Sequence, residues 1–186
     1  YWKNEKATKE TFDGEWFKTG DIGTIDEDGY VQITGRKKEM IVTAGGKNVA
    51  PATLEDPIRA NPIVGQIVVV GDKRPFIGAL ISLDEEMLPV WLNNNGEDPT
   101  MTIEQASTNP KVLAEIQSAI DRANSKVSRA ESIRKFVILP HDLTEETGHL
   151  TPKLSIKRHV ILVDFADTID GLYEDAPPTQ GHSVVG

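Results

Sequence analysis

The sequence has 186 residues, of which 38% are hydrophobic and 26% are charged, as is typical of a globular protein with one large domain or two small ones. Its formal net charge of -9 lacks the basic excess that nucleic-acid binding needs, so we expect no nucleic-acid partner. The absence of cysteine excludes disulfides, thiolate metal ligands and cysteine nucleophiles, and suits a reducing cytoplasm.

No apolar run approaches the roughly 20 residues of a transmembrane helix, although peripheral contact with a membrane stays open. The first residues, YWKNEKATKE, are polar, so we expect no signal peptide. Because the sequence begins with Tyr1 rather than Met, we expect a processed product or an excised fragment.

The N-terminal part contains little that could form a hydrophobic core. Residues 1–13 are predicted to form a loop or a short helix, and two strands are predicted at 16–25 and 30–34. Asp28-Gly29 between them predicts a hairpin, because both residue types tolerate positive φ. A lone hairpin is marginally stable in water, so we expect this one to pack on something else.

Residues 35–51, GRKKEMIVTAGGKNVAP, separate this hairpin from a different pattern. A charged cluster from Arg36 to Glu39 precedes a short apolar strand at 40–42. Gly45-Gly46 then predicts a turn, and Pro51 suits the first turn of a helix. We therefore predict a boundary between two structural units in this stretch.

The pattern after this stretch is that of an α+β unit. Strands are predicted at 63–70 and 76–83, which would form a hairpin, and at 133–139. The predicted helices are residues 52–60, interrupted around Pro57, residues 85–93, capped by Asp84, and a long helix that starts at Asn109-Pro110. An apolar stripe marks the long helix, made by Val112, Leu113, Ile116, Ala119, Ile120, Ala123 and Val127.

The C-terminal part is expected to begin with an exposed polar loop at 141–150. A terminal helix should follow, with Ile156, Val160 and Val163 on its inner face and with Ile161 and Phe165 as further candidates. Residues 175–186 have the composition of a disordered tail.

Two polar residues near the hairpin are candidates for nucleotide binding. Asp21 lies between two glycines, and its two carboxylate oxygens match the two vicinal hydroxyls of a ribose. Arg36 presents a planar fork that suits ribose or phosphate oxygens. Each has a structural alternative, a carboxylate in a turn and a surface arginine.

Two other features are candidates for contact with an anionic ligand. Gly45-Gly46 would let backbone approach such a ligand closely, although a glycine pair more often marks a tight turn. Lys153 and Lys157, with Arg158, follow a loop and could neutralise charge on a phosphate, or could equally be the basic start of a surface helix. The four histidines have no metal-like pairing, so no metal site is expected.

Taken in order, four motifs resemble the adenylate-forming acyl-CoA synthetases, and most closely their long-chain fatty acyl-CoA ligase branch: WFKTGDIG, DEDGY, GRKKEMIVTAGGKNVAP and, far downstream, LTPKLSIKR. The resemblance implies a mobile α+β C-terminal domain at 37–174, with a central, mainly antiparallel three-stranded sheet packed by helices. Residues 1–36 would then be the β-hairpin end of the large N-terminal adenylation domain.

The resemblance also implies roles for individual residues near the boundary. Asp21 would hold the ribose hydroxyls of ATP or AMP, and Arg36 would also contact the nucleotide. Lys38 falls at the hinge position of the family. Gly45 and Gly46 would lie on the loop that faces the pantetheine tunnel of CoA.

One lysine in the downstream motif would bridge the α-phosphate and the acyl carboxylate during adenylation. Lys157 is the better match for this catalytic role. Because Ile156 replaces the glycine of the commoner family ending, Lys153 remains a rival. Glu55 matches an acidic position of the family to which we assign no role.

The implied reaction converts ATP, a fatty acid and CoA to acyl-CoA, AMP and pyrophosphate through an acyl-adenylate. Mg²⁺ and the substrates would bind mainly through the N-terminal domain of the same protein, so the chain alone is expected to be inactive. Alternatives are a fatty acyl-AMP ligase, a ligase of another carboxylic acid, and a non-catalytic α+β binding module.

Overall fold

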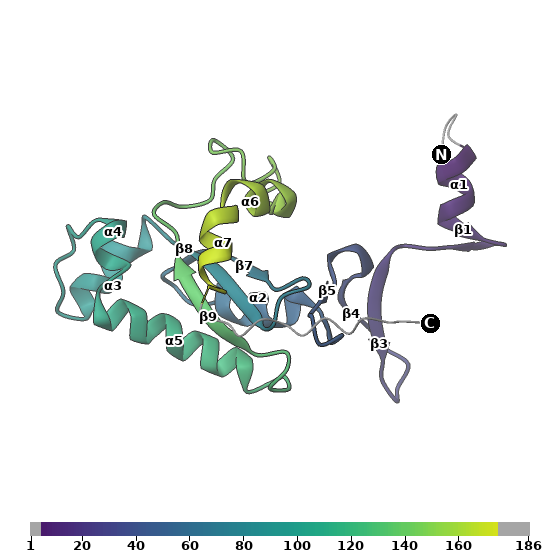
Figure 1. Ribbon diagram of the computed structural model, residues 1–186, viewed down its shortest axis with the longest axis horizontal. Coiled ribbons are helices and arrows are strands. Elements are labelled where there is room, and N and C mark those ends of the chain that lie inside the picture. Colours follow the sequence, from purple (N-terminus) through teal and green to yellow (C-terminus); the bar gives the residue numbers. More distant parts are fainter. Residues whose placement is uncertain (1–4, 175–186) are drawn as a thin grey trace. The chain divides into compact units, whose positions relative to one another are not determined.

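The computed structural model describes residues 5–174 and divides into two units between Met40 and Ile41 (Figure 1). The sequence predicted the boundary between residues 36 and 37, close to this division. The tail predicted to be disordered, 175–186, lies outside the described residues.

The first unit consists of a short helix and two small antiparallel pairs of strands. Its elements are α1 (Glu5–Thr11), β1 (Phe12–Asp13), β2 (Trp16–Phe17), β3 (Asp21–Ile25) and β4 (Val31–Arg36). The prediction of a single strand at 16–25 is wrong. Residues between β2 and β3 are not in a strand, and Gly20 among them has a φ of 79°. None of the side chains described between residues 5 and 40 is buried, which agrees with the expected lack of a core.

The β3–β4 hairpin confirms the predicted Asp-Gly turn. The Gly29 N–H donates to the Asp26 carbonyl at 3.1 Å, and Asp26 Oδ1 accepts from the N–H groups of Asp28 and Tyr30. The apolar side chains of Ile25, Val31 and Ile33 on these strands are exposed in this chain. The hairpin is therefore held by its turn and its ladder rather than by burial.

The second unit is built around a three-stranded sheet with the order β7-β8-β9. Its strands are β7 (Val64–Val70), β8 (Ile77–Leu83) and β9 (Ile133–Ile138). The β7–β8 hairpin is antiparallel as predicted, whereas β9 is parallel to β8, so the sheet is mixed rather than mainly antiparallel. Parallel pairing follows from the helical crossover between β8 and β9.

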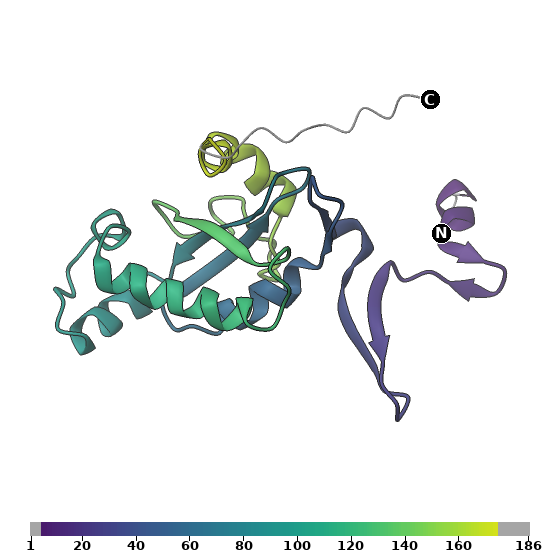
Figure 2. The same cartoon turned by 60° about the horizontal axis from the view of Figure 1, so that its bottom comes forward.

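Helices cover both faces of this sheet, which explains the continuous apolar runs of β7 and β8 (Figure 2). Side chains that alternate along β7 enter two different clusters. Ile67 and Val69 join the larger cluster with α2 (Pro51–Arg59), α3 (Met87–Asn94) and α5 (Pro110–Asn124). Val68 and Val70 join the smaller cluster with α6 (Arg158–Asp164) and α7 (Ala166–Gly171).

The helix signals in the sequence act largely as expected. Asn109 Oδ1 caps α5 by accepting from the N–H groups of Lys111 and Val112, and Asp84 Oδ1 accepts from two N–H groups at the start of α3. A short helix, α4 (Ile103–Ala106), lies between α3 and α5. The predicted interruption around Pro57 is wrong, because α2 continues through this residue to Arg59.

Two expectations for the C-terminal part are wrong. The segment 141–150 is not a simple exposed loop, because Leu143, His149 and Leu150 are buried. The single terminal helix is two short helices, α6 and α7, and Val163 is 74% exposed while Phe165 is buried. Because the chain changes direction near Phe165, between α6 and α7, the residues predicted to share one apolar helix face do not lie on a single face.

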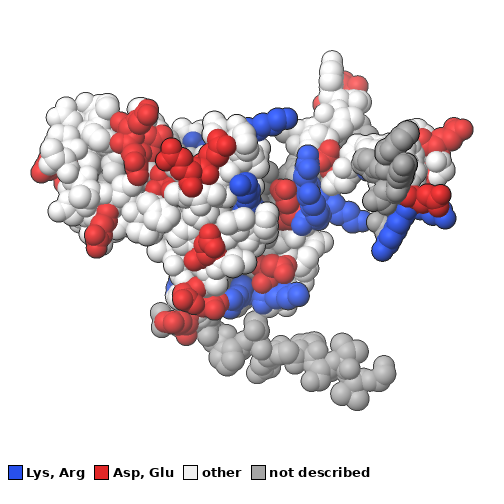
Figure 3. Space-filling view, turned by 90° about the horizontal axis from the view of Figure 1, so that it is seen from above, with Lys and Arg blue, Asp and Glu red and all other residues white. Residues whose placement is uncertain are grey.

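A short pair of strands, β5 (Ile41–Val42) and β6 (Asn48–Val49), opens the second unit, and their antiparallel pairing closes the Gly45-Gly46 turn. A 3-10 helix, η1 (Lys37–Glu39), precedes β5. On the face of the molecule seen in Figure 3, acidic side chains are spread over the larger unit with a few basic ones among them. This distribution agrees with the negative net charge.

Candidate functional site

Asp21 and Arg36 face each other across the open end of the β3–β4 hairpin. They are paired in register, and Arg36 Nε lies 3.4 Å from Asp21 Oδ1. The Asp21 N–H donates to Thr19 Oγ1 at 3.1 Å, and the Lys37 N–H donates to the Gly20 carbonyl at 2.8 Å. Both side chains keep exposed surface, so the carboxylate and the guanidinium could contact one ligand with both hydroxyls and anionic oxygens.

Lys38 lies in η1, just before the division between the units. The Lys37 N–H still belongs to the hairpin through its bond to Gly20, and the Val42 N–H belongs to the second unit through a 3.1 Å bond to Asp72 Oδ1. Between these points, residues 38–40 make no main-chain hydrogen bond to any other residue of the described range 5–174, apart from those of η1 itself. The local structure at Lys38 is therefore compatible with a change of φ and ψ.

The Gly45-Gly46 turn has a defined backbone geometry. The Thr43 N–H donates to the Lys47 carbonyl at 3.0 Å, and the Gly46 N–H donates to the Thr43 carbonyl at 2.8 Å. Gly46 has a φ of 76°, a conformation that favours glycine, whereas Gly45 has no such requirement. A Cβ at Gly45 would come no closer than 3.9 Å to another residue, so this glycine leaves open main-chain surface.

Contacts on two sides hold this turn in place. The Ala44 N–H donates to the Arg74 carbonyl at 2.9 Å, and Lys47 Nζ lies 3.5 Å from Glu131 Oε1. Hydrogen bonds from Ser128 lower the pKa of Glu131 from its ordinary value, and Lys47 lowers it further. The turn is thus anchored to the β7–β8 connection and to the segment that follows α5.

Lys153 and Lys157 lie on a small hairpin closed by an antiparallel bridge between Leu150 and Ile156. Lys153 is at the exposed tip, next to Leu154, which has a φ of 58°. Lys157 follows the bridge and is partly buried. The structure thus gives the two lysines different settings, one on a tip and one at the base of the hairpin.

The main chain of Lys157 is fixed, while its amino group is available. The Lys157 N–H donates to the carbonyl of His149 at 2.8 Å, and the buried ring of His149 contacts Thr147 Oγ1 at 2.8 Å and Asp164 Oδ2 at 3.1 Å. Lys157 is also the residue that precedes α6. Within residues 5–174, its amino group makes no ion pair.

A buried ion pair lies beside Lys157 and was not identified from the sequence. Glu55 is 5% exposed, and its Oε1 lies 2.6 Å from Arg158 Nη2. The sequence does contain a signal for this pair, because Leu54 and Ile58 place Glu55 on the buried face of α2. A carboxylate within an apolar stripe requires a partner, and its nearest cation is Arg158, with Arg59 Nη2 at 4.0 Å from the other carboxylate oxygen.

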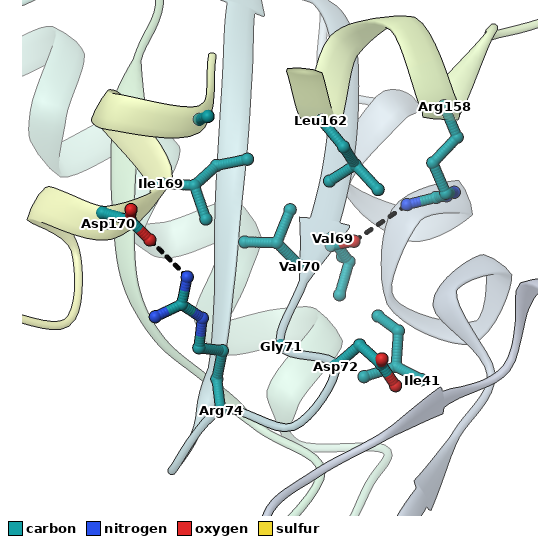
Figure 4. A pocket seen from close by; sticks show the side chains of 11 residues that line it. Ile41, Val69, Val70, Gly71, Asp72, Arg74, Arg158, Leu162, Ile169 and Asp170 are labelled. Carbon is teal, nitrogen blue, oxygen red and sulfur yellow. Dashed lines mark hydrogen bonds and ion pairs between the residues drawn. The ribbon is translucent and has the colours of Figure 1, made fainter. Parts of the chain in front are cut away.

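Arg158 also lines a cavity of about 310 Å³ between α6, α7 and the end of β7 (Figure 4). Its walls are largely apolar side chains, including Val70, Leu162 and Ile169. An ion pair between Arg74 and Asp170 lies at the other end of the cavity. No residue selected from the sequence as a site candidate other than Arg158 lines it.

Residues 5–174 contain no group of three or more His, Asp or Glu side chains that could hold a metal ion. Mg²⁺ bound through one or two carboxylates and the phosphates of ATP would not require such a group. None of the helices within residues 5–174 is long and apolar enough to cross a membrane.

The structure brings some of the predicted site residues together and leaves others apart. Asp21 and Arg36 form one pair in the first unit. In the second unit, the Gly45-Gly46 turn and Lys157 are held by separate contacts, and no hydrogen bond or ion pair in the described part of the chain joins them.

The second unit, with its glycine turn and lysine hairpin, has the architecture of a known domain. Residues 38–177 match the family model described as the AMP-binding enzyme C-terminal domain. The chain belongs to this family. The adenylation domain of a carboxylate reductase from Mycobacterium chelonae has the same fold, with a TM-score of 0.72 and 22% identity over 94% of this chain and 26% of that one.

Two relatives with similar sequences are long-chain-fatty-acid–CoA ligases. A long-chain-fatty-acid–CoA ligase of Mycobacterium tuberculosis is 56% identical over 173 residues, which are 93% of this chain and 29% of that protein. A long-chain-fatty-acid–CoA ligase of Gallus gallus is 37% identical over 95% of this chain and 25% of that protein. The chain thus spans less than a third of the length of either relative.

Proposed function

We propose that this chain is the C-terminal part of a long-chain fatty acid–CoA ligase, an acid–thiol ligase. The observation that carries the proposal is the 56% identity with the Mycobacterium tuberculosis ligase over 93% of the chain. In the proposed reaction, the fatty acid carboxylate attacks the α-phosphorus of ATP and releases pyrophosphate. The CoA thiol then attacks the acyl-adenylate and releases AMP.

The Asp21–Arg36 pair is the proposed contact to the nucleotide. The Asp21 carboxylate would accept hydrogen bonds from the ribose hydroxyls of ATP or AMP, and the Arg36 guanidinium would donate to nucleotide oxygens. Support comes from their registered pairing at the end of the hairpin and from the surface that both keep exposed. A carboxylate beside a guanidinium presents acceptors and donors at neighbouring points.

Lys157 is the proposed catalytic residue of the first step, in which it would contact the α-phosphate and the acyl carboxylate. A fixed cation at this position would stabilise negative charge that develops during attack on phosphorus. Support comes from its fixed main chain and from its amino group, which makes no ion pair within residues 5–174. Lys153, at the exposed tip of the hairpin, is the alternative that the experiment must exclude.

The second step is proposed to use a different face of the same domain. Rotation about Lys38 would replace Lys157 at the reaction centre with the Gly45-Gly46 turn, whose open main chain would line the path of the CoA pantetheine. Support comes from the position of Lys38 in η1 and from the absence of side chains on the turn. Domain motion about a few hinge residues that absorb the change of φ and ψ is known in enzymes.

The proposed partners are the fatty acid, ATP, CoA and the large N-terminal domain of the same protein. The chain by itself is proposed to be inactive, because it spans only 29% of the Mycobacterium tuberculosis relative. The proposed location is the cytoplasm, with peripheral contact at a membrane surface.

The test uses the intact ligase that contains this chain, with the variants Lys157→Ala and Lys153→Ala. Pyrophosphate release from ATP and fatty acid measures the first step, and thioester formation from supplied acyl-adenylate and CoA measures the second. Lys157→Ala should slow the first step on the order of a hundred-fold or more and spare the second. Lys126→Ala, at an exposed lysine of the same unit, is the matched control.

Three results would contradict parts of the proposal. Normal pyrophosphate release in Lys157→Ala together with a loss in Lys153→Ala would transfer the catalytic role to Lys153. Unchanged half-reactions in Lys38→Pro would refute the hinge. Release of acyl-adenylate without thioester in the presence of CoA would identify an acyl-AMP ligase instead.

A further inference from the structure

The free edge of strand β7 is closed by two charged side chains rather than by another strand. β7 is an outer strand of the sheet. The Val69 N–H donates to Glu55 Oε1 at 2.8 Å, and the Val69 carbonyl accepts from Arg158 Nη1 at 2.8 Å. Because Arg158 Nη2 also lies 2.6 Å from Glu55 Oε1, helices α2 and α6 and strand β7 meet at one set of hydrogen bonds.

This set, the Glu55–Val69–Arg158 clamp, is largely shielded from water. The Glu55 side chain is 7% exposed and that of Arg158 is 19% exposed. Figure 4 shows the Arg158 side chain extending from the start of α6 to the Val69 carbonyl. Because the guanidinium is planar and bonded to two different acceptors, its orientation is fixed as well as its position.

The clamp fixes the residue next to Lys157. Lys157 is the non-helical residue before α6, with a φ of -87° and a ψ of 72°, and one planar peptide bond joins it to Arg158. Holding Arg158 on β7 therefore restrains the backbone from which the Lys157 side chain leaves. The Lys157 N–H is held independently by the His149 carbonyl at 2.8 Å. The lysine thus extends from a backbone that is fixed on both sides, while its own amino group makes no ion pair within the described residues.

We infer that Glu55 and Arg158 are positioning residues that orient Lys157 for adenylation, an inference that rests on the proposed function of Lys157. Neither residue touches the reacting atoms. Arg158 acts through the backbone at the start of α6, and Glu55 acts through Arg158. The clamp should therefore matter for the step that uses Lys157 and much less for thioester formation.

The experiment measures the two half-reactions in the intact ligase for Glu55→Gln, Lys157→Ala and the double variant. Glutamine retains an oxygen for the Val69 N–H but removes the charge that holds Arg158. Glu55→Gln should slow pyrophosphate release on the order of ten- to a hundred-fold, because a small displacement of a catalytic group lowers the reaction rate by factors of this size. Thioester formation from supplied acyl-adenylate should stay within about two-fold.

The double variant distinguishes positioning from general support of the fold. If Glu55 acts through Lys157, the double variant should be no slower in pyrophosphate release than Lys157→Ala alone, since the group being oriented is already gone. Glu85→Gln changes an exposed glutamate of the same unit and is the matched control, with both rates unchanged. Thermal unfolding of each variant shows whether it is folded.

Arg158→Lys keeps the inference testable if Glu55→Gln does not fold. Lysine retains a charge for Glu55 but cannot contact Glu55 and the Val69 carbonyl with the same planar fork. It should slow pyrophosphate release and spare thioester formation, as Glu55→Gln does.

Two results would overturn the inference while leaving the proposed function intact. In the first, the double variant releases pyrophosphate more slowly than Lys157→Ala by the factor that Glu55→Gln shows alone. In the second, Glu55→Gln or Arg158→Lys slows both half-reactions equally. Unchanged pyrophosphate release in Glu55→Gln or Arg158→Lys would do the same. Unchanged pyrophosphate release in Lys157→Ala would instead refute the proposed catalytic role and the inference with it.

Discussion

Replacing Arg158 by Met should destabilise the second unit substantially, because it removes the nearer of the two arginines beside the buried Glu55 carboxylate and leaves only Arg59, at 4.0 Å. Methionine keeps a similar apolar stem but removes the 2.6 Å contact to Glu55 and the 2.8 Å bond to the Val69 carbonyl. Breaking a buried ion pair by removing one partner costs about 3–5 kcal/mol. Because Glu55 keeps its bond from the Val69 N–H, we expect the lower end, about 3 kcal/mol.

A double-mutant cycle measures how much of this loss belongs to the pair. Glu55→Gln should cost about 2 kcal/mol, since it replaces a charged acceptor by a neutral one. The double variant Glu55→Gln/Arg158→Met should be more stable than the sum of the two losses predicts, by about 1–3 kcal/mol. Urea unfolding of this chain, followed by the far-ultraviolet circular dichroism of its helices, provides the free energies.

The Arg74–Asp170 pair is the matched control, because it is also an arginine–carboxylate pair of the second unit. Its side chains are 40% and 61% exposed, and exposed pairs contribute about 0.5 kcal/mol. The cycle with Arg74→Met and Asp170→Asn should therefore give a small coupling energy. A coupling at Glu55–Arg158 no larger than this one would refute the argument from burial.

Three further predictions concern pH and the glycine turn. Burial raises the pKa of Tyr173 to about 12, so the stability that its neutral phenol contributes should be complete below pH 10.0 and lost as the pH rises towards 12. The hydrogen bonds from Ser128 lower the pKa of Glu131, so the stability that this carboxylate contributes should be lost as the pH falls through the lowered pKa, and Glu131→Gln should reduce that loss. Gly46→Ala should cost about 1–2 kcal/mol, whereas Gly45→Ala should change the unfolding free energy by less than about 0.5 kcal/mol.

Each of these has a direct measurement and a contrary result. For Tyr173, phenolate absorbance gives the pKa and Tyr173→Phe is the control, and ordinary titration near pH 10.0 would contradict the effect of burial. For Glu131, the free energy of unfolding is measured as a function of pH. An equal loss of stability at low pH in the original chain and in Glu131→Gln would contradict the role of its hydrogen bonds. For the turn, equal losses in urea unfolding for Gly45→Ala and Gly46→Ala would contradict the conformational argument.

Local patterns in the sequence predicted most of the elements. The β-branched runs produced β7 and β8, the apolar stripe after Asn109 produced α5, and Asp28-Gly29 produced the β3–β4 hairpin. These signals work because they act over a few residues, through side-chain periodicity, capping and permitted φ values. Family motifs selected Asp21 and Arg36, and the hairpin register explains why residues this far apart meet.

Errors arose where distant contacts decide the outcome. The direction of β9 depends on the crossover through α5, which no pattern within the strand specifies. The polar segment 141–150 buries Leu143, His149 and Leu150 because these side chains find partners on other elements. The spacing of the apolar residues after Ile156 is compatible with more than one apolar helix face. Packing against the sheet divides this segment into α6 and α7 near Phe165 and leaves Val163 exposed.

The sequence by itself determined the family, the order of the elements and the residues that are candidates for chemistry, because motifs and periodicity are properties of neighbouring residues. Only the tertiary structure decided what surrounds those candidates. Glu55 and Arg158 are far apart in the chain, and they meet because the free edge of β7 leaves an N–H and a carbonyl that require partners once buried. That requirement exists only after α2, β7 and α6 have packed together.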